Sequence, residues 1–142
     1  MKVSARNAFA GTVSAIVDGK VNAEIEVSLA GGDRLVAIVT EGSGGELGLA
    51  LGKPVIAYVK APWVMLLAGP QDMRFSARNQ LTGQVSELVK GAVNSEVVLS
   101  LPGGTQVYAV VTNEAVMELG LKVGSEATAL IKASHVILGV PV

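Results

Sequence analysis

Alternation of apolar and polar residues is clearest from Val21 to Leu29. Every second side chain in this segment is apolar, and the residues between them are polar or acidic. A period of two predicts a strand with one face on a core and the other toward water. The equivalent segment Val93–Leu101 differs in that Val98 replaces Glu26, so one outward position is apolar and a neighbour is expected to cover it. Two equivalent half-buried strands are therefore expected, one in each half of the chain.

Shorter apolar runs predict further strands around these two. Ala8–Val17 is expected to be a strand that turns at Asp18-Gly19 and carries a bulge at Gly11. Glycine pairs at Gly31-Gly32 and Gly103-Gly104 predict a second tight turn in each half. The remaining expected strands are Leu35–Thr40, Pro54–Lys60, Val64–Leu67, Val107–Thr112, Glu126–Lys132 and Val136–Leu138.

A short helix is expected where the pattern changes after Thr40 and after Thr112. In the second half, Thr112 or Asn113 is a suitable N-cap, good helix formers follow, and Gly120 is a suitable left-handed stop. The segment Glu41–Leu49 contains Gly42, Gly44 and Gly45 within the expected helix. Glycine disfavours the helix interior, so the first helix is expected to be shorter or looser than the second.

The two halves are copies of one unit. Residues 4–68 align without a gap with residues 76–140, and 29 of the 65 aligned positions are identical. Self-similarity at a fixed period indicates a tandem repeat. The sequence therefore predicts two domains, residues 1–70 and 71–142, joined by a linker so short that they pack together. Five strands and one helix per copy predict an all-β fold of two tandem OB-like five-stranded Greek-key barrels, each with one short helix.

Composition limits the classes of function. Half of the residues are hydrophobic and 16% are charged, which is more apolar surface than two small cores can bury, so an oligomer is expected. A net charge of −1 and few aromatic residues argue against nucleic-acid binding. No apolar run approaches the ~20 residues of a membrane-spanning helix. The first residues lack the pattern of a secretory signal, so no membrane association and a cytoplasmic location are expected.

An enzyme is not expected. His135 is the only histidine, and Trp63 occupies its position in the other copy, so a surface or interface residue is the preferred interpretation. Acidic residues and histidine show no spacing typical of metal ligands, and cysteine is absent. We therefore expect no catalytic residues, no catalytic cofactor and no site for a free metal cation.

Cationic and hydroxyl side chains are retained in both copies while most other charged positions differ. The retained pairs are Ser4/Ser76, Arg6/Arg78, Thr40/Thr112 and Lys60/Lys132. Donor-only side chains and hydroxyls suit a tetrahedral oxyanion that has no proton to donate. This set contains no carboxylate, which favours molybdate, tungstate or sulfate over protonated phosphate. The alternative is structural, with a solvated arginine before a strand and a lysine that blocks a strand edge.

At these residues the chain resembles a known family. Ser-Ala-Arg-Asn, Val-Asn-(Ala/Ser)-Glu, Gly-Gly, Leu-Gly-Leu and Lys-Ala, in this order, resemble the Mop domain of molbindins, and two tandem copies resemble the di-Mop form. The resemblance implies an OB-like barrel, a homotrimer, and storage of molybdate or tungstate at domain and subunit interfaces. It implies that the Ser-x-Arg segment of one unit and the Thr and Lys-Ala segments of another hold the anion. The implied binding residues are Ser4, Ala5, Arg6, Thr40, Lys60 and Ala61, with Ser76, Ala77, Arg78, Thr112, Lys132, Ala133 and Ser134 in the second copy.

One position departs from the family pattern. Pro62 stands where the second copy has Ser134, and proline lacks both the hydroxyl and the N–H group. Two unequal kinds of site are therefore expected. An oxyanion-sensing module that acts through a partner in the regulation of molybdate transport is the alternative function. A nucleic-acid-binding OB protein is a third hypothesis, which the composition opposes.

Overall fold

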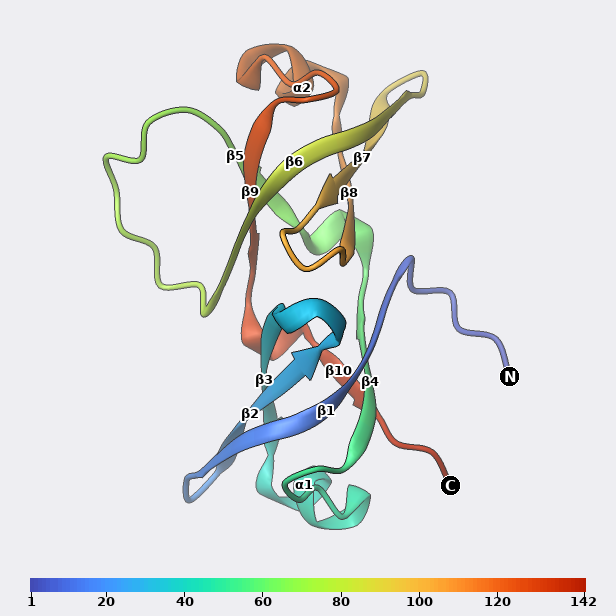
Figure 1. Ribbon diagram of the computed structural model, residues 1–142, viewed down its shortest axis with the longest axis vertical. Coiled ribbons are helices and arrows are strands. Elements are labelled where there is room, and N and C mark those ends of the chain that lie inside the picture. The colour runs from blue at the N-terminus through green and yellow to red at the C-terminus, as the bar shows by residue number, and fades with distance from the viewer.

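The computed structural model describes residues 1–142 and is dominated by β-strands (Figure 1). The first copy contains β1 (Asn7–Asp18), β2 (Asn22–Leu29), the 3₁₀ helix η1 (Ala30–Gly32), β3 (Arg34–Thr40), α1 (Glu41–Leu47), β4 (Pro54–Val59), η2 (Ala61–Trp63) and β5 (Met65–Leu67). The second copy contains β6 (Asn79–Lys90), β7 (Asn94–Ser100), β8 (Gln106–Thr112), α2 (Asn113–Leu119), β9 (Glu126–Ile131), η3 (Ala133–His135) and β10 (Ile137–Gly139).

The strands form two antiparallel five-stranded sheets, in the orders β10-β4-β1-β2-β3 and β5-β9-β6-β7-β8. Figure 1 shows the sheets at opposite ends of an elongated molecule, with α1 and α2 at its two tips. Two OB-like units, each with one short helix, agree with the architecture expected from the sequence. No helix is long and apolar enough to cross a membrane.

Each sheet takes its short fifth strand from the other copy. Met65 of β5 pairs with Leu130 of β9 in the second sheet, and Ile137 of β10 pairs with Tyr58 of β4 in the first. The hydrophobic pattern predicted both short strands but not their partners. Before each of them, a 3₁₀ turn packs against the other copy, η2 against β8 and η3 against β3. The chain is thereby led across to the opposite sheet.

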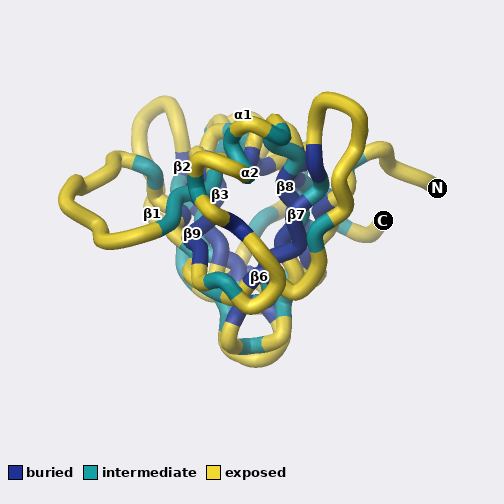
Figure 2. The backbone as a smooth tube through the Cα atoms, turned by 90° about the horizontal axis from the view of Figure 1, so that it is seen from above, coloured by how far each residue is buried: buried dark blue, intermediate teal, exposed yellow.

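One continuous hydrophobic core includes residues from both copies. Twenty-four buried residues contribute to it, among them Ile25 and Leu35 of the first copy and Leu99 and Ile131 of the second. Seen along the long axis, the buried segments lie in the middle and the loops surround them (Figure 2). The copies therefore pack directly on one another, as the short linker predicts.

The long first strand of each copy bends at a bulge, but not at the expected glycine. The register of β1 with β2 shifts between Val13 and Ala15. Gly11 lies two residues earlier, where a Cβ atom would overlap the carbonyl oxygen of Ser28. The prediction of a bulge at Gly11 was therefore wrong. That position requires glycine because β2 passes too close for any side chain.

The two helices have equal lengths, so the expectation of a shorter first helix was also wrong. Both span seven residues. Thr40 and Thr112 are the N-caps, and their hydroxyls accept hydrogen bonds from the third residue of each helix. Gly48 and Gly120 end the helices in the left-handed conformation, each with φ of 63°. Identical caps at both ends fix the length of α1 despite its internal glycines.

Candidate functional site

The Asn residue of each Ser-Ala-Arg-Asn motif joins the two copies. Asn7 is buried, its Nδ2 donates to the carbonyl of Tyr108 at 2.8 Å, and its Oδ1 accepts from the Tyr108 N–H at 2.7 Å. Asn79 makes the same pair of bonds with Val36, at 2.8 and 2.7 Å. The amide side chain thus pairs with the backbone as a neighbouring strand would. This clamp fixes the preceding arginine at the junction between the copies.

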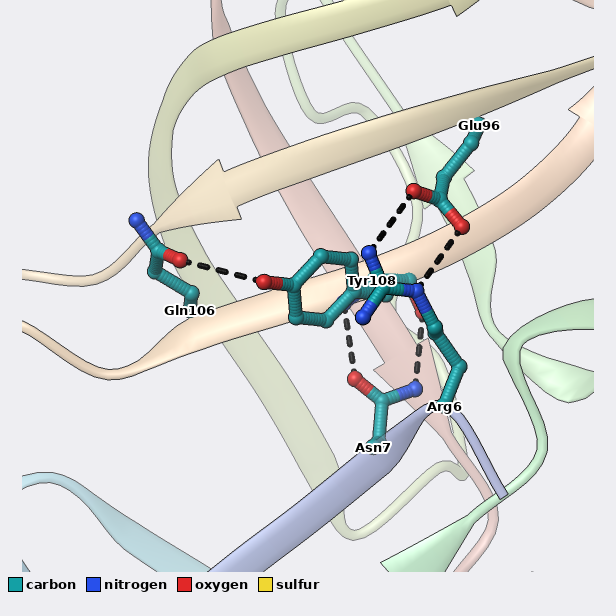
Figure 3. Close-up of polar contacts among 5 residues, drawn as sticks. All are labelled: Arg6, Asn7, Glu96, Gln106 and Tyr108. Carbon is teal, nitrogen blue, oxygen red and sulfur yellow. Dashed lines mark hydrogen bonds and ion pairs between the residues drawn. The ribbon is translucent and has the colours of Figure 1, made fainter. Parts of the chain in front are cut away.

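Arg6 lies in a cluster of side chains from the second copy (Figure 3). Its Nε donates to Glu96 Oε2 and its Nη2 to Glu96 Oε1, both at 3.2 Å. Its guanidinium carbon lies 3.9 Å from the centre of the Tyr108 ring, within the range of a cation–π interaction. The hydrogen bonds that Arg6 donates to Glu96 raise the pKa of Arg6, and desolvation opposes this effect. The first-copy arginine is therefore engaged through two N–H groups and one face.

Arg78 has the equivalent position but fewer partners. Its Nη1 donates to Glu24 Oε2 at 2.5 Å, which is the only hydrogen bond of its side chain. The residue at the position of Tyr108 is Val36, which offers no aromatic face. About half of each arginine side chain is exposed, 51% for Arg78 and 54% for Arg6, so the two differ in their partners and not in their exposure. More of its donors are therefore available to a ligand than those of Arg6.

A cavity of about 330 Å³ lies beside Arg78. It brings together six of the seven residues implied for the second copy, which are Ser76, Ala77, Arg78, Lys132, Ala133 and Ser134. Its remaining walls are mostly apolar and come from both copies, namely Ile38, Trp63, Met65, Phe75, Leu130 and His135. The lining thus combines cations and hydroxyls with mostly apolar side chains.

Thr112, the seventh residue, does not line this cavity. It lies in a separate hollow with Pro62, Val64 and Asn94. Within one chain, the Ser-x-Arg and Lys-Ala-Ser segments of the same copy therefore lie together. The combination implied by the resemblance, Ser-x-Arg of one unit with the Thr and Lys-Ala segments of another, stays a prediction. The hydroxyl of Thr112, like that of Thr40, caps a helix.

The first copy arranges its cations differently. The ammonium nitrogen of Lys60 lies 5.6 Å from the centre of the Trp63 ring. Ala61 is buried and Pro62 follows it in the 3₁₀ turn η2. Arg6 is paired with Glu96, and Ser4 and Ala5 precede β1 on the extended N-terminal segment (Figure 1). Both cations of the first copy thus lie over aromatic rings.

The equivalent residues Trp63 and His135 meet where the two copies join. Their ring centres are 5.0 Å apart at an interplanar angle of 43°. Nδ1 of His135 is buried and has no hydrogen-bond partner. His135 therefore lies at the interface between the copies, in agreement with its interpretation from the sequence.

Two kinds of residue at this junction were missed by sequence reasoning. Glu24 and Glu96 are identical in the two copies, as are Asn7 and Asn79. Their retention in both copies, like that of the cations, is the sequence signal that marks them. Their presence changes the expected shell, because a carboxylate lies beside each arginine.

The chain belongs to the TOBE domain family, which matches residues 3–66 and 76–138. It carries two tandem copies of that domain, and the resemblance to Mop domains is confirmed by relatives of that name. The chain is 47% identical over 141 residues to the molybdenum-pterin-binding protein MopA of Rhodobacter capsulatus. It is 44% identical over 140 residues to the molybdenum transport protein ModE of Azotobacter vinelandii. In both cases 99% of this chain is covered, and the chain spans about half the length of the relative.

A solved structure matches the whole chain. The crystal structure of the cytoplasmic molybdate-binding protein ModG with molybdate bound is 59% identical in sequence. The alignment covers 99% of this chain and 100% of that chain, with a TM-score of 0.94. The protein is thus similar to ModG in fold and sequence along nearly its whole length.

Proposed function

We propose that the protein binds molybdate or tungstate in the cytoplasm and stores the oxyanion for molybdenum homeostasis. The observation that carries this proposal is the cavity beside Arg78, where Lys132, Ser76 and Ser134 converge with the arginine. The similarity to ModG, whose structure contains molybdate, supports the choice of ligand.

The chemistry of the cavity suits a small dianion. Arg78 and Lys132 offer only donors, and the two serines add hydroxyls of adjustable direction. Two cations at about 4 Å contribute a few kcal/mol each at most, which largely offsets the lost hydration of the anion. Glu24 is the nearby acceptor, and its repulsion of the anion is reduced while it pairs with Arg78.

We further propose a homotrimer in which anion sites lie at domain and subunit interfaces. Several large apolar side chains are exposed on the single chain, including Met65, Ile137 and Trp63, and burial of exposed apolar surface favours association. Because Thr112 lies outside its own copy's cavity, a neighbouring subunit is the natural source of a threonine ligand. The first-copy set would be Ser4, Ala5, Arg6, Thr40, Lys60 and Ala61.

Isothermal titration calorimetry with molybdate, tungstate, sulfate and phosphate tests the proposed ligand. Binding of molybdate and tungstate at micromolar protein is expected, with weaker binding of sulfate and phosphate. Arg78→Gln and Lys132→Ala are expected to weaken molybdate binding. The matched control is Arg34→Gln, because Arg34 is an exposed arginine that is also paired with a glutamate, at 3.1 Å. Absence of heat with molybdate would refute the proposal, and equal sulfate affinity would remove its selectivity.

Analytical ultracentrifugation tests the proposed assembly. The expected species is about 43 kDa, three times the 14.5 kDa of one chain. Met65→Ser is expected to shift the distribution toward smaller species, because Met65 is 65% exposed in the single chain and loses apolar area on substitution. A monomer at all concentrations would contradict the interfacial sites without excluding anion binding by one chain.

The second candidate function is an oxyanion-sensing module that acts through a partner. The similarity to ModE proteins, which include a DNA-binding transcriptional dual regulator of Escherichia coli, favours this alternative. Affinity capture with the tagged protein from molybdate-replete and molybdate-starved cells separates the two functions. A partner retained in only one condition would support sensing, and its absence in both would support storage.

A further inference from the structure

The duplicated site is built with aromatic rings over the cations of one copy only. Arg6 lies 3.9 Å from the Tyr108 ring and Lys60 lies 5.6 Å from the Trp63 ring. At the equivalent places, Arg78 has Val36 of the first copy beside it and Lys132 has His135 of the second copy. The two copies therefore carry the same cations, but only the cations of the first copy make cation–π contacts.

We infer that Tyr108 is an affinity-determining residue. Together with Glu96 it holds Arg6 at the junction between the copies, so that the first-copy set binds an oxyanion more weakly than the second-copy set. This inference rests on the proposed oxyanion binding and adds which residues set the affinity of each copy.

The partners of Arg6 compete with a ligand in two ways. Glu96 accepts from both Nε and Nη2, so an anion that uses this edge of the guanidinium must displace a carboxylate. The ring of Tyr108 covers one face of the Arg6 guanidinium, so movement of the guanidinium toward a ligand also breaks the cation–π contact. Arg78 instead donates through a single Nη1 to Glu24. Its other N–H groups can bind a ligand without losing this contact.

The tyrosine ring is fixed where it is by its own backbone. The clamp of Asn7 holds both the N–H and the carbonyl of Tyr108. Its hydroxyl donates to Gln106 Oε1 at 3.2 Å. The ring is thus held against the arginine from two sides (Figure 3). Valine already occupies the equivalent position 36 of the same fold, so a valine at position 108 is compatible with the strand.

The repeat allows each copy to be measured separately. In an Arg78→Gln background, molybdate binding reports the first copy, and in an Arg6→Gln background it reports the second. The Arg6→Gln protein is expected to bind molybdate more tightly than the Arg78→Gln protein. In the Arg78→Gln background, Tyr108→Val is expected to raise the affinity about twofold to fivefold, the factor that one exposed cation–π contact represents. Tyr108→Phe keeps the ring and is expected to match the background.

The reciprocal substitution tests the inference independently. In the Arg6→Gln background, Val36→Tyr places a ring beside Arg78 and is expected to lower molybdate affinity by a similar factor. Thermal unfolding of every variant verifies that it is folded. Molybdate binding by the wild type, with equal affinities in the two backgrounds and no effect of Tyr108→Val, would overturn this inference alone. Absence of molybdate binding by the wild type would overturn the proposed function together with it.

Discussion

Replacement of Asn7 by alanine tests whether the amide clamp holds the two copies together. The side chain is 1% exposed and satisfies both the N–H and the carbonyl of Tyr108. Alanine removes both bonds and leaves two partly buried backbone groups without partners. Each unsatisfied group costs about 1–2 kcal/mol, so the free energy of unfolding is expected to fall by about 2–4 kcal/mol.

The expected loss corresponds to a large change in melting temperature. With an unfolding entropy of about 2.1 cal/mol/K per residue, a chain of this length loses about 7–13 °C. Differential scanning calorimetry at fixed protein concentration measures the change, because oligomers melt in a concentration-dependent way. Asn22→Ala is the matched control, since Asn22 is an exposed asparagine at the start of β2. A shift below about 2 °C for Asn7→Ala, or an equal shift for Asn22→Ala, would refute the reasoning.

Three further sites test the packing of the copies and the cap of a helix. Gly31→Ala places a Cβ against the Gly103 turn at φ of 78°, whereas Gly32→Ala at φ of 93° meets open space. By chemical denaturation, Gly32→Ala should lower the free energy of unfolding by about 1–2 kcal/mol because of its backbone conformation alone. Gly31→Ala should cost about 1–3 kcal/mol more because of the overlap. Thr112→Ala should cost about 1 kcal/mol through loss of the N-cap, while Thr112→Ser should recover most of it in the same assay. Leu138→Ala should cost about 2–3 kcal/mol, and hydrogen exchange should increase in β4 of the first copy before β9; the opposite order would contradict the strand exchange.

The internal repeat made the fold largely predictable. Alternation and glycine turns placed the strands of both copies, and Thr112 and Gly120 correctly marked the ends of the second helix. The partners of β5 and β10 could not be predicted, because both are three-residue strands whose pattern fits either sheet. Their choice depends on how η2 and η3 direct the chain, which is a property of the packed copies and not of a local segment.

The candidate site was predictable in its donors and not in its counter-ions. Serine, arginine and lysine of the second copy line one cavity, because they flank strands that are neighbours in the same sheet. The Glu24 and Glu96 partners belong to the opposite copy from the arginines they bind. Such contacts arise from the pseudo-twofold packing of the repeat, which the order of residues along one copy does not reveal.

The strand exchange also constrains how the protein is made. β10 occupies residues 137–139 yet forms an edge of the sheet that contains β1. A ribosome that has synthesised the whole first copy has therefore released a sheet with a vacant edge, which stays unpaired until the last residues of the second copy emerge. Domains that fold during synthesis usually do so one after another. Here the sheet of the first copy is completed only when β10 emerges, after every strand of the other sheet, so the nascent chain exposes the unpaired edge of β4 until then.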